Sequence, residues 1–199
     1  NMYIYPSFSG SFVFSELLKL GDKLPYGKVR MSWAQVGSDT DPYQLGLVYT
    51  KSKFAYPGYT IGYISNGTIP NKDLKPTKTN SFEMGLELKF LKNRIGLDFT
   101  YYSQLSKNQI MGMASSSTSG YGYRLINAGE IENKGVEIAL NTRPIQTKDF
   151  SWDLNFNFSK NSNKVKKLVD DMDMFELEKA TWLDVQVAAK VGENFGSIV

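Results

Sequence analysis

The chain has 199 residues and a net charge of +3, from 23 Lys and Arg against 20 Asp and Glu, and it contains neither Cys nor His. Disulfide bonds, thiolate or imidazole metal sites and His-based catalytic triads are therefore excluded within it. A charge this small, without a basic stripe, also lacks the electrostatic footprint of a nucleic-acid-binding protein.

No apolar run approaches the length of about 18 residues that a transmembrane helix needs. Aromatic residues make up 14% of the chain, which favours strands over helices. The N-terminal residues show neither the charged nor the apolar part of a signal peptide, and residues 195–199 resemble the start of a further strand. We therefore expect the chain to be an internal part of a longer protein.

Six stretches alternate apolar and polar residues with a period of two, which predicts strands. In the clearest of them, Phe82, Met84 and Leu86 alternate with Glu83 and Glu87. Each stretch has about nine to eleven residues, the length that a tilted strand needs to cross a bilayer. We predict strands over residues 7–15, 28–36, 82–90, 94–102, 134–143 and 150–160.

The alternation also assigns the two faces of the predicted strands. We expect Leu86 and Leu154 to face lipid. Glu87 and Asn155, each one residue further along, should face a water-filled lumen, because transmembrane strands alternate lipid-facing and lumen-facing residues.

The predicted strands are joined alternately by short and long segments. Residues 91–93 and 144–149 form short turns and 16–26 a somewhat longer one, whereas 37–81 and 104–133 are long and rich in Gly, Ser, Asn, Thr and Tyr. Short turns in the periplasm and long loops outside the cell are typical of an outer-membrane barrel.

A soluble β-sandwich also alternates apolar and polar residues. Three features favour the barrel: strands that are longer than the five or six residues usual in a sandwich, the regular change between short and long connections, and mixed charge along the polar faces. The pattern alone leaves the sandwich open as the second fold.

Residues 164–177 allow two interpretations. Val165, Leu168, Val169, Met172 and Phe175 fall at helical spacing, which would suit a short amphipathic helix over an outer loop. Alternatively, the sixth strand continues through this stretch. The extended interpretation is favoured for its first half, and the second half is left open.

Several carboxylates invite a chemical interpretation, but we expect no catalysis. Glu83, Glu87, Asp98 and Glu137 lie on predicted lumen faces, where two of them could imitate the carboxylate pair of a glycosidase. They belong to separate strands with mixed charge, and nothing distinguishes one of them. Residues 39–42 place Asp before Pro at the end of a strand, which indicates a turn rather than a calcium loop.

The outer segments hold the remaining candidates for binding. An acidic cluster could bind Ca²⁺, although a solvated surface is the simpler interpretation; it comprises Asp170, Asp171, Asp173, Glu176 and Glu178. Exposed tyrosines could stack on a sugar ring or line a peptide groove, or else pack loop on loop; they are Tyr56, Tyr59, Tyr63, Tyr121 and Tyr123. Solvated lysines that could also meet lipopolysaccharide phosphate are Lys75, Lys78 and Lys107.

Motifs over nearly the whole chain resemble the barrel of TonB-dependent outer-membrane receptors, most closely the SusC/RagA branch found in Bacteroidetes. The matching stretches are 5–15, 27–43, 69–85, 93–102, 127–137 and 191–196. Single pieces such as Leu74-Lys75-Pro76 are weak, whereas the combination is specific.

The resemblance implies an all-β fold, an antiparallel transmembrane barrel of about 22 strands, of which residues 1–199 would form one part in the C-terminal half. It implies a plug domain outside this chain, no cofactor, no metal and no enzymatic activity. It also implies TonB-energised import of oligosaccharides or peptides across the outer membrane, together with a SusD-like surface lipoprotein and the TonB complex. The alternatives are a passive porin or adhesive surface barrel and, less favoured, a soluble carbohydrate-binding β-sandwich.

Overall fold

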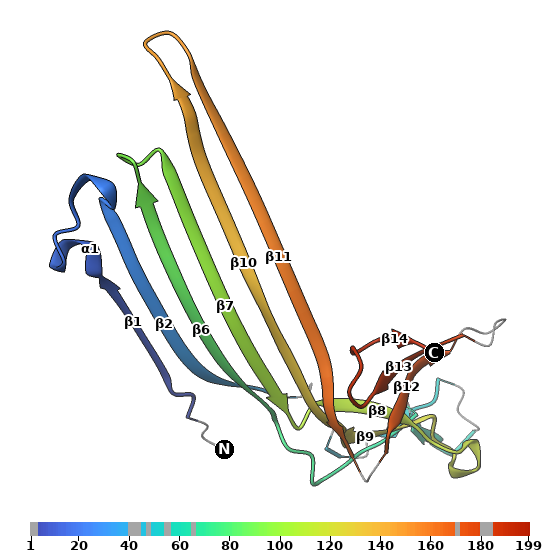
Figure 1. The fold of residues 1–199 in the computed structure, drawn as a ribbon. Coiled ribbons are helices and arrows are strands. Elements are labelled where there is room, and N and C mark those ends of the chain that lie inside the picture. Colours follow the sequence, from blue (N-terminus) through green and yellow to red (C-terminus); the bar gives the residue numbers. More distant parts are fainter. Residues whose placement is uncertain are drawn as a thin grey trace.

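The structure, a computed structural model, describes residues 4–39, 45–46, 49–53, 57–64, 67–169, 172–179 and 185–199. Its dominant element is one antiparallel sheet in which six strands follow one another in the order of the chain (Figure 1). These strands are β1 (Ser7–Val13), β2 (Tyr26–Ser38), β6 (Thr77–Phe90), β7 (Ile95–Lys107), β10 (Gly129–Gln146) and β11 (Ser151–Leu168).

Each of these six strands overlaps one of the six predicted stretches, but the predicted bounds are wrong at several ends. The first stretch was expected to reach residue 15, whereas β1 ends at Val13 and the short helix α1 (Phe14–Leu17) follows, before the 3-10 turn η1 (Gly21–Lys23). Phe14 leaves the strand ladder because its ring turns over Gly27, where any side chain would collide with it. The alternation still places Phe14 correctly, on the apolar side of the sheet.

At the opposite end the strands run further than predicted. β6 begins at Thr77, β7 continues to Lys107 and β10 begins at Gly129. These extensions were missed because polar side chains occupy both faces there, so the apolar period ends before the hydrogen-bonded ladder does. Gln35 and Asn80, for example, share the apolar face and join their side-chain amides at 2.8 Å.

The extended interpretation of residues 164–168 is confirmed and the helical one is wrong. β11 continues to Leu168, and after a break the chain forms β12 (Met174–Lys179). Asp170 and Asp171, which lie between the two strands, fall outside the described residues.

Smaller sheets gather at the end of the large sheet that lies opposite the short turns (Figure 1). β12, β13 (Gln186–Lys190) and β14 (Ser197–Ile198) form one. β3 (Tyr49–Lys51) pairs with β4 (Gly62–Ile64) in another. The third joins β5 (Thr68–Ile69), β8 (Ile110–Ala114) and β9 (Tyr123–Asn127), with the 3-10 turn η2 (Ser117–Ser119) between the last two strands.

Cross-strand register separates the large sheet into an apolar and a polar face. One row of directly opposed residues is wholly apolar and contains Val29, Leu86, Phe99, Ile138 and Phe158. The adjacent row points to the other side, and it contains Lys28, Glu87, Asp98, Ala139 and Asn157.

The apolar face does not contain the core of the described structure. Phe8 is 70% exposed and Phe158 is 57% exposed, whereas a buried cluster of Val165, Leu168 and Phe175 lies at the outer end, beside the small sheets. A sandwich would bury such a face against a second sheet, and no second sheet covers it in the described part of the chain. The arrangement therefore fits a face that meets lipid.

The apolar band crosses the sheet obliquely. It ends at Trp33 on β2, and the β11 residue in register with Trp33 is Ser162, but on β11 the band already ends at Phe158. The band thus moves about 13 Å along the strands over about 19 Å across them. The strands are therefore tilted by about 35° from the perpendicular to the band, the tilt that strands have in an outer-membrane barrel. The short turns step in the same direction in Figure 1.

No helix in the described residues is long and apolar enough to cross a membrane.

Candidate functional site

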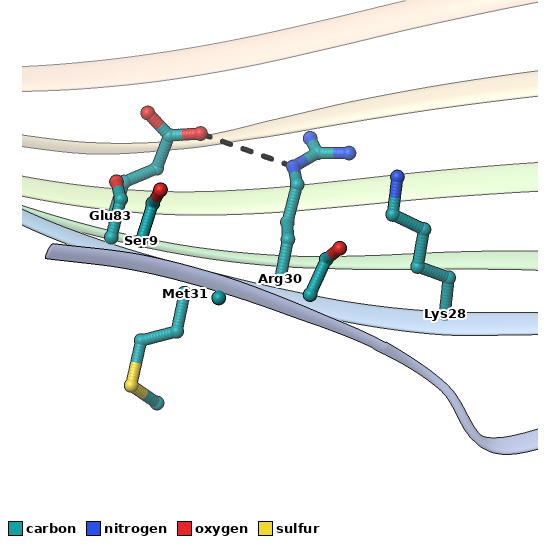
Figure 2. Close-up of a pocket in the computed structure, with 8 residues that line it drawn as sticks. Ser9, Lys28, Arg30, Met31 and Glu83 are labelled. Carbon is teal, nitrogen blue, oxygen red and sulfur yellow. Dashed lines mark ion pairs between the residues drawn. The ribbon is translucent and has the colours of Figure 1, made fainter.

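The polar face is organised around Arg30. Its guanidinium donates two hydrogen bonds to the carboxylate of Asp98, Nη1 to Oδ2 at 3.0 Å and Nη2 to Oδ1 at 2.9 Å, and a third to Thr100 Oγ1 at 2.6 Å. Glu83 lies 3.9 Å from Nε on the other side. In Figure 2, Lys28, Arg30 and Glu83 project to one side of the sheet and Met31 to the opposite side.

A glycine makes the reach of Arg30 possible. Arg30 lies on β2 and Asp98 on β7, with β6 between them, and the residue of β6 in register with both Arg30 and Thr100 is Gly85. A side chain at Gly85 would collide with the Arg30 side chain. Arg30 therefore lies flat across β6 and leaves the space in front of the sheet open.

A second long side chain crosses a glycine further along the polar face. Tyr102 of β7 lies over Gly135 of β10 and donates a hydrogen bond from its hydroxyl to Asn161 Oδ1 of β11 at 3.2 Å. Two long side chains thus bridge strands that are not neighbours, each over a glycine. The result is a polar wall, braced by its own side chains.

Several carboxylates on this wall are partners of cations. Both oxygens of Asp98 accept from Arg30, and Glu87 lies 3.8 Å from Lys89, whose ammonium also sits 4.8 Å from the centre of the Tyr26 ring. A shallow hollow of about 550 Å³ on the wall is lined partly by Arg30, Asp98 and Glu137. This arrangement offers a solute mixed charge and hydrogen bonds rather than a free acid and base.

Asn127 connects the two long outer segments. Its side-chain oxygen accepts from the Lys75 backbone N–H at 2.9 Å, and its Nδ2 donates to the carbonyls of Lys75 at 2.7 Å and Asn108 at 3.0 Å. The Asn127 side chain thus makes the hydrogen bonds that a paired strand would make. It joins residues 67–76, which precede β6, to residues 108–128, which lie between β7 and β10. The parallel pairing of β5 with β9 joins the same two segments.

The predicted tyrosines lie in this loop region. Tyr59 is 73% exposed, Tyr63 on β4 is 52% exposed and Tyr123 at the start of β9 is 56% exposed, whereas Tyr121 is half-buried. Tyr56 lies outside the described residues. The hollows on the polar wall are lined by other residues, so the tyrosines and the wall form two separate surfaces.

Sequence reasoning missed Tyr49. It lies on β3, opposite Ile64 of β4, and 68% of it is exposed. Tyr63 lies opposite Thr50, so the two tyrosines are on opposite faces of this strand pair. The signal used for the other tyrosines was a neighbouring Gly or Pro, and Tyr49 has neither. The sequence pattern did not indicate the pairing of β3 with β4, which places Tyr49 in the same small sheet as Tyr63 but on its other face.

The remaining charged candidates are distributed over the outer end. Among described residues no group of acidic side chains is arranged to hold a metal ion. Lys107 forms an ion pair with Glu130 at 3.5 Å. Lys190 and Glu193 form another at 2.7 Å, and the hydrogen bond to Glu193 raises the pKa of Lys190.

Comparisons with known proteins agree with this geometry. The family model described as "TonB dependent receptor-like, beta-barrel" matches residues 4–182. TonB-dependent receptor P3 of Formosa agariphila is 32% identical over 79% of this chain, and TonB-dependent receptor SusC of Bacteroides thetaiotaomicron is 31% identical over 74%. The chain spans 16% of the length of each of these two relatives.

A solved structure shows the same fold. A chain in the structure of the RagAB peptide transporter superposes with a TM-score of 0.81 over 95% of this chain and 20% of its own length, at 21% identity. The predicted barrel fold is therefore confirmed, and the residues compared form an open part of such a barrel.

Proposed function

The chain belongs to the TonB-dependent receptor β-barrel family, and we propose that it forms part of the wall of an outer-membrane importer energised by TonB. The observation that carries the proposal is a single sheet with an uncovered apolar face, tilted as a membrane barrel requires, and a polar face braced by Arg30 and Tyr102. The segment that contacts TonB and the plug domain would lie outside residues 1–199.

The two faces of the large sheet would have different roles in the importer. The apolar face would sit in the hydrocarbon of the outer membrane, and the polar wall would face the plug and the solute. Because the bridging side chains lie flat over glycines, the wall presents hydrogen-bonding groups without narrowing the lumen. Such a surface suits a solute with many hydroxyl or amide groups, so we propose oligosaccharides or peptides as cargo.

The tyrosine-bearing loops would meet the cargo or its carrier. Tyr59, Tyr63 and Tyr123 are exposed at the outer end, and a tyrosine offers both a flat apolar ring and a hydroxyl. We propose that these residues, with Tyr56 and Tyr121, contact the solute or a SusD-like surface lipoprotein that covers the barrel.

Uptake by intact cells tests the proposal. Cells that carry the full-length receptor should take up a labelled oligosaccharide or oligopeptide, and uptake should stop when TonB is deleted or when the proton gradient is collapsed. Uptake that continues without TonB would identify a passive porin instead. Absence of any uptake, with the barrel assembled in the membrane, would favour an adhesive surface protein.

The role of the loops needs its own comparison. Replacing Tyr63 with Ala should reduce uptake or lipoprotein capture, whereas Tyr63→Phe keeps the ring and should retain most of it. Tyr101→Ala is a matched control because Tyr101 of β7, opposite Met84, lies on the apolar face of the large sheet, away from the polar wall and the outer loops. Equal uptake by the Tyr63→Ala receptor and the unmodified receptor would remove Tyr63 from the proposed contact.

A further inference from the structure

Lysines gather on the lipid-side face of the large sheet, directly beyond its apolar band. On β11 the band ends at Phe158, and Lys160 and Lys164 follow on the same face. The strand register places further lysines of β6, β7 and β10 on the same face, beside those of β11. Its exposed members are Lys78, Lys107, Lys134, Lys160, Lys164 and Lys166.

Acidic residues neutralise only half of this group. Glu132 pairs with Lys134 at 3.2 Å and with Lys166 at 3.3 Å, and Glu130 pairs with Lys107. Within the described part of the chain, no ion pair involves Lys160 or Lys164. Glu132, which pairs with Lys134 and Lys166, lies directly opposite Lys164, so a single carboxylate faces these three lysines.

Three of the lysines surround one hydroxyl. Ser162 lies between Lys160 and Lys164 on the same face of β11, and Lys134 of β10 is its direct cross-strand partner. Lys134 is therefore a diagonal neighbour of both β11 lysines, at about 7–8 Å between backbones. Long side chains at this spacing can converge on one anion, and the Ser162 hydroxyl adds a further donor.

The position of these lysines, next to the apolar band, indicates which kind of ligand they would bind. Lysines outnumber carboxylates around Ser162, because Glu132 alone faces Lys134, Lys164 and Lys166. The excess like charges repel one another, and an anion between them would reduce that repulsion. Phe158, two residues from Lys160, faces lipid tails in the proposed importer. A partner that meets both the lysines and Phe158 carries an anionic group next to acyl chains, and the phosphate of a lipid headgroup is such a group.

We propose that Lys134, Lys160 and Lys164 bind the phosphate of an anionic lipid headgroup in the outer leaflet, with Phe158 against its acyl chains. The inference rests on the proposed placement of the sheet in the membrane and goes beyond the import function. Lys107, which could also meet lipid phosphate, forms an ion pair with Glu130. Lys78 lies beside Lys107 in register, at the margin of this cluster.

Lipid binding to the full-length receptor tests the inference. The receptor, purified in a neutral detergent, is titrated with dimyristoylphosphatidylglycerol or with dimyristoylphosphatidylcholine, and bound lipids are counted by native mass spectrometry. The anionic lipid should bind more tightly. Each lysine near an anionic surface contributes about fivefold in affinity, so the K160Q/K164Q variant should lose about 25-fold of the preference.

Matched variants separate this effect from misfolding. K160R/K164R keeps both charges and should keep the preference, and K28Q removes a lysine from the polar face and should change nothing. Inorganic phosphate alone should not compete, because it makes no contact with Phe158. A preference that survives in K160Q/K164Q, or full competition by inorganic phosphate, would overturn the inference.

The uptake assay is read separately from lipid binding. A receptor that imports its solute under TonB control but shows no anionic preference would refute the lipid site and leave the proposed function standing. A receptor that binds the anionic lipid but does not import would refute the proposed function and leave the lipid site standing.

Discussion

Arg30 and Asp98 are joined by two hydrogen bonds, at 3.0 and 2.9 Å, although a complete strand lies between the strands that carry them. The connection exists because Gly85 has no side chain in the path of the guanidinium. An ion pair between adjacent strands would brace one pairing; this one braces β2, β6 and β7 together.

Gly85→Ala should break this brace. The added methyl group collides with Arg30, and charged hydrogen bonds contribute about 1.5–3 kcal/mol each. About a third of the Arg30 and Asp98 side chains is exposed, and solvent weakens their interaction. We therefore expect a loss of about 1–2 kcal/mol in the unfolding free energy of the full-length barrel. Denaturant unfolding measures it. Gly96→Ala is the control, since its new methyl group would make only ordinary contacts, and an equal loss there would refute the specific role of Gly85.

Leu86→Arg should destabilise the barrel by about 2–4 kcal/mol, the cost of an arginine near the bilayer midplane. Leu86 lies in the middle of the apolar band, opposite Val29 and Phe99. Leu154→Arg should act in the same direction, whereas Asn155→Arg on the polar face should be tolerated. A soluble sandwich would also suffer from a buried arginine, so accessibility must accompany stability: a spin label at position 154 should be relaxed by oxygen and not by a polar nickel reagent. The opposite preference would reject the lipid face.

Cysteine labelling tests the orientation. The chain has no native cysteine, so Ser116→Cys and Asn93→Cys introduce single reactive sites in this region, both at exposed positions. On intact cells an impermeant thiol reagent should label position 116, in the loop before β9, and should not label position 93, in the short turn before β7. Labelling at position 93 alone would invert the proposed orientation.

Asn127→Asp should loosen the two outer loops. The aspartate can still accept from the Lys75 backbone N–H, but it loses both donations, to Lys75 and Asn108. Hydrogen exchange should become faster in 67–76 and 108–128 while the strands of the large sheet keep their protection. Asn155→Asp provides the control on the polar wall. Unchanged exchange in the two loops would show that the β5–β9 pairing holds them without Asn127.

The 199-residue chain by itself should not yield a soluble monomer. β1 and β11 leave the sheet with two open edges, and the uncovered apolar face is an aggregation surface in water. Expression without the rest of a barrel should therefore give inclusion bodies. A soluble monomer with cooperative thermal unfolding would contradict the barrel interpretation.

The strand positions and the two faces could be predicted from the sequence because a strand's side chains alternate with a period of two. Leu86 and Glu87 are assigned by their immediate neighbours alone, and the register agrees with that assignment. The same rule failed at residues 14–15, where the ring of Phe14 over Gly27, a contact across the sheet, replaces the strand with a helix. It also placed the start of β6 at residue 82 rather than at Thr77, because a ladder of backbone hydrogen bonds does not depend on apolar side chains.

The sequence by itself determined that this protein is built from long amphipathic strands with short and long connections, since periodicity and composition are local properties. Only the tertiary structure decided that Arg30 reaches Asp98 across Gly85, that Asn127 holds Lys75, and that Lys134 joins Lys160 and Lys164 around Ser162. Those relationships depend on the register between strands. The contacts themselves join residues that are 28 to 68 positions apart in the sequence, and no local pattern in the sequence contains them.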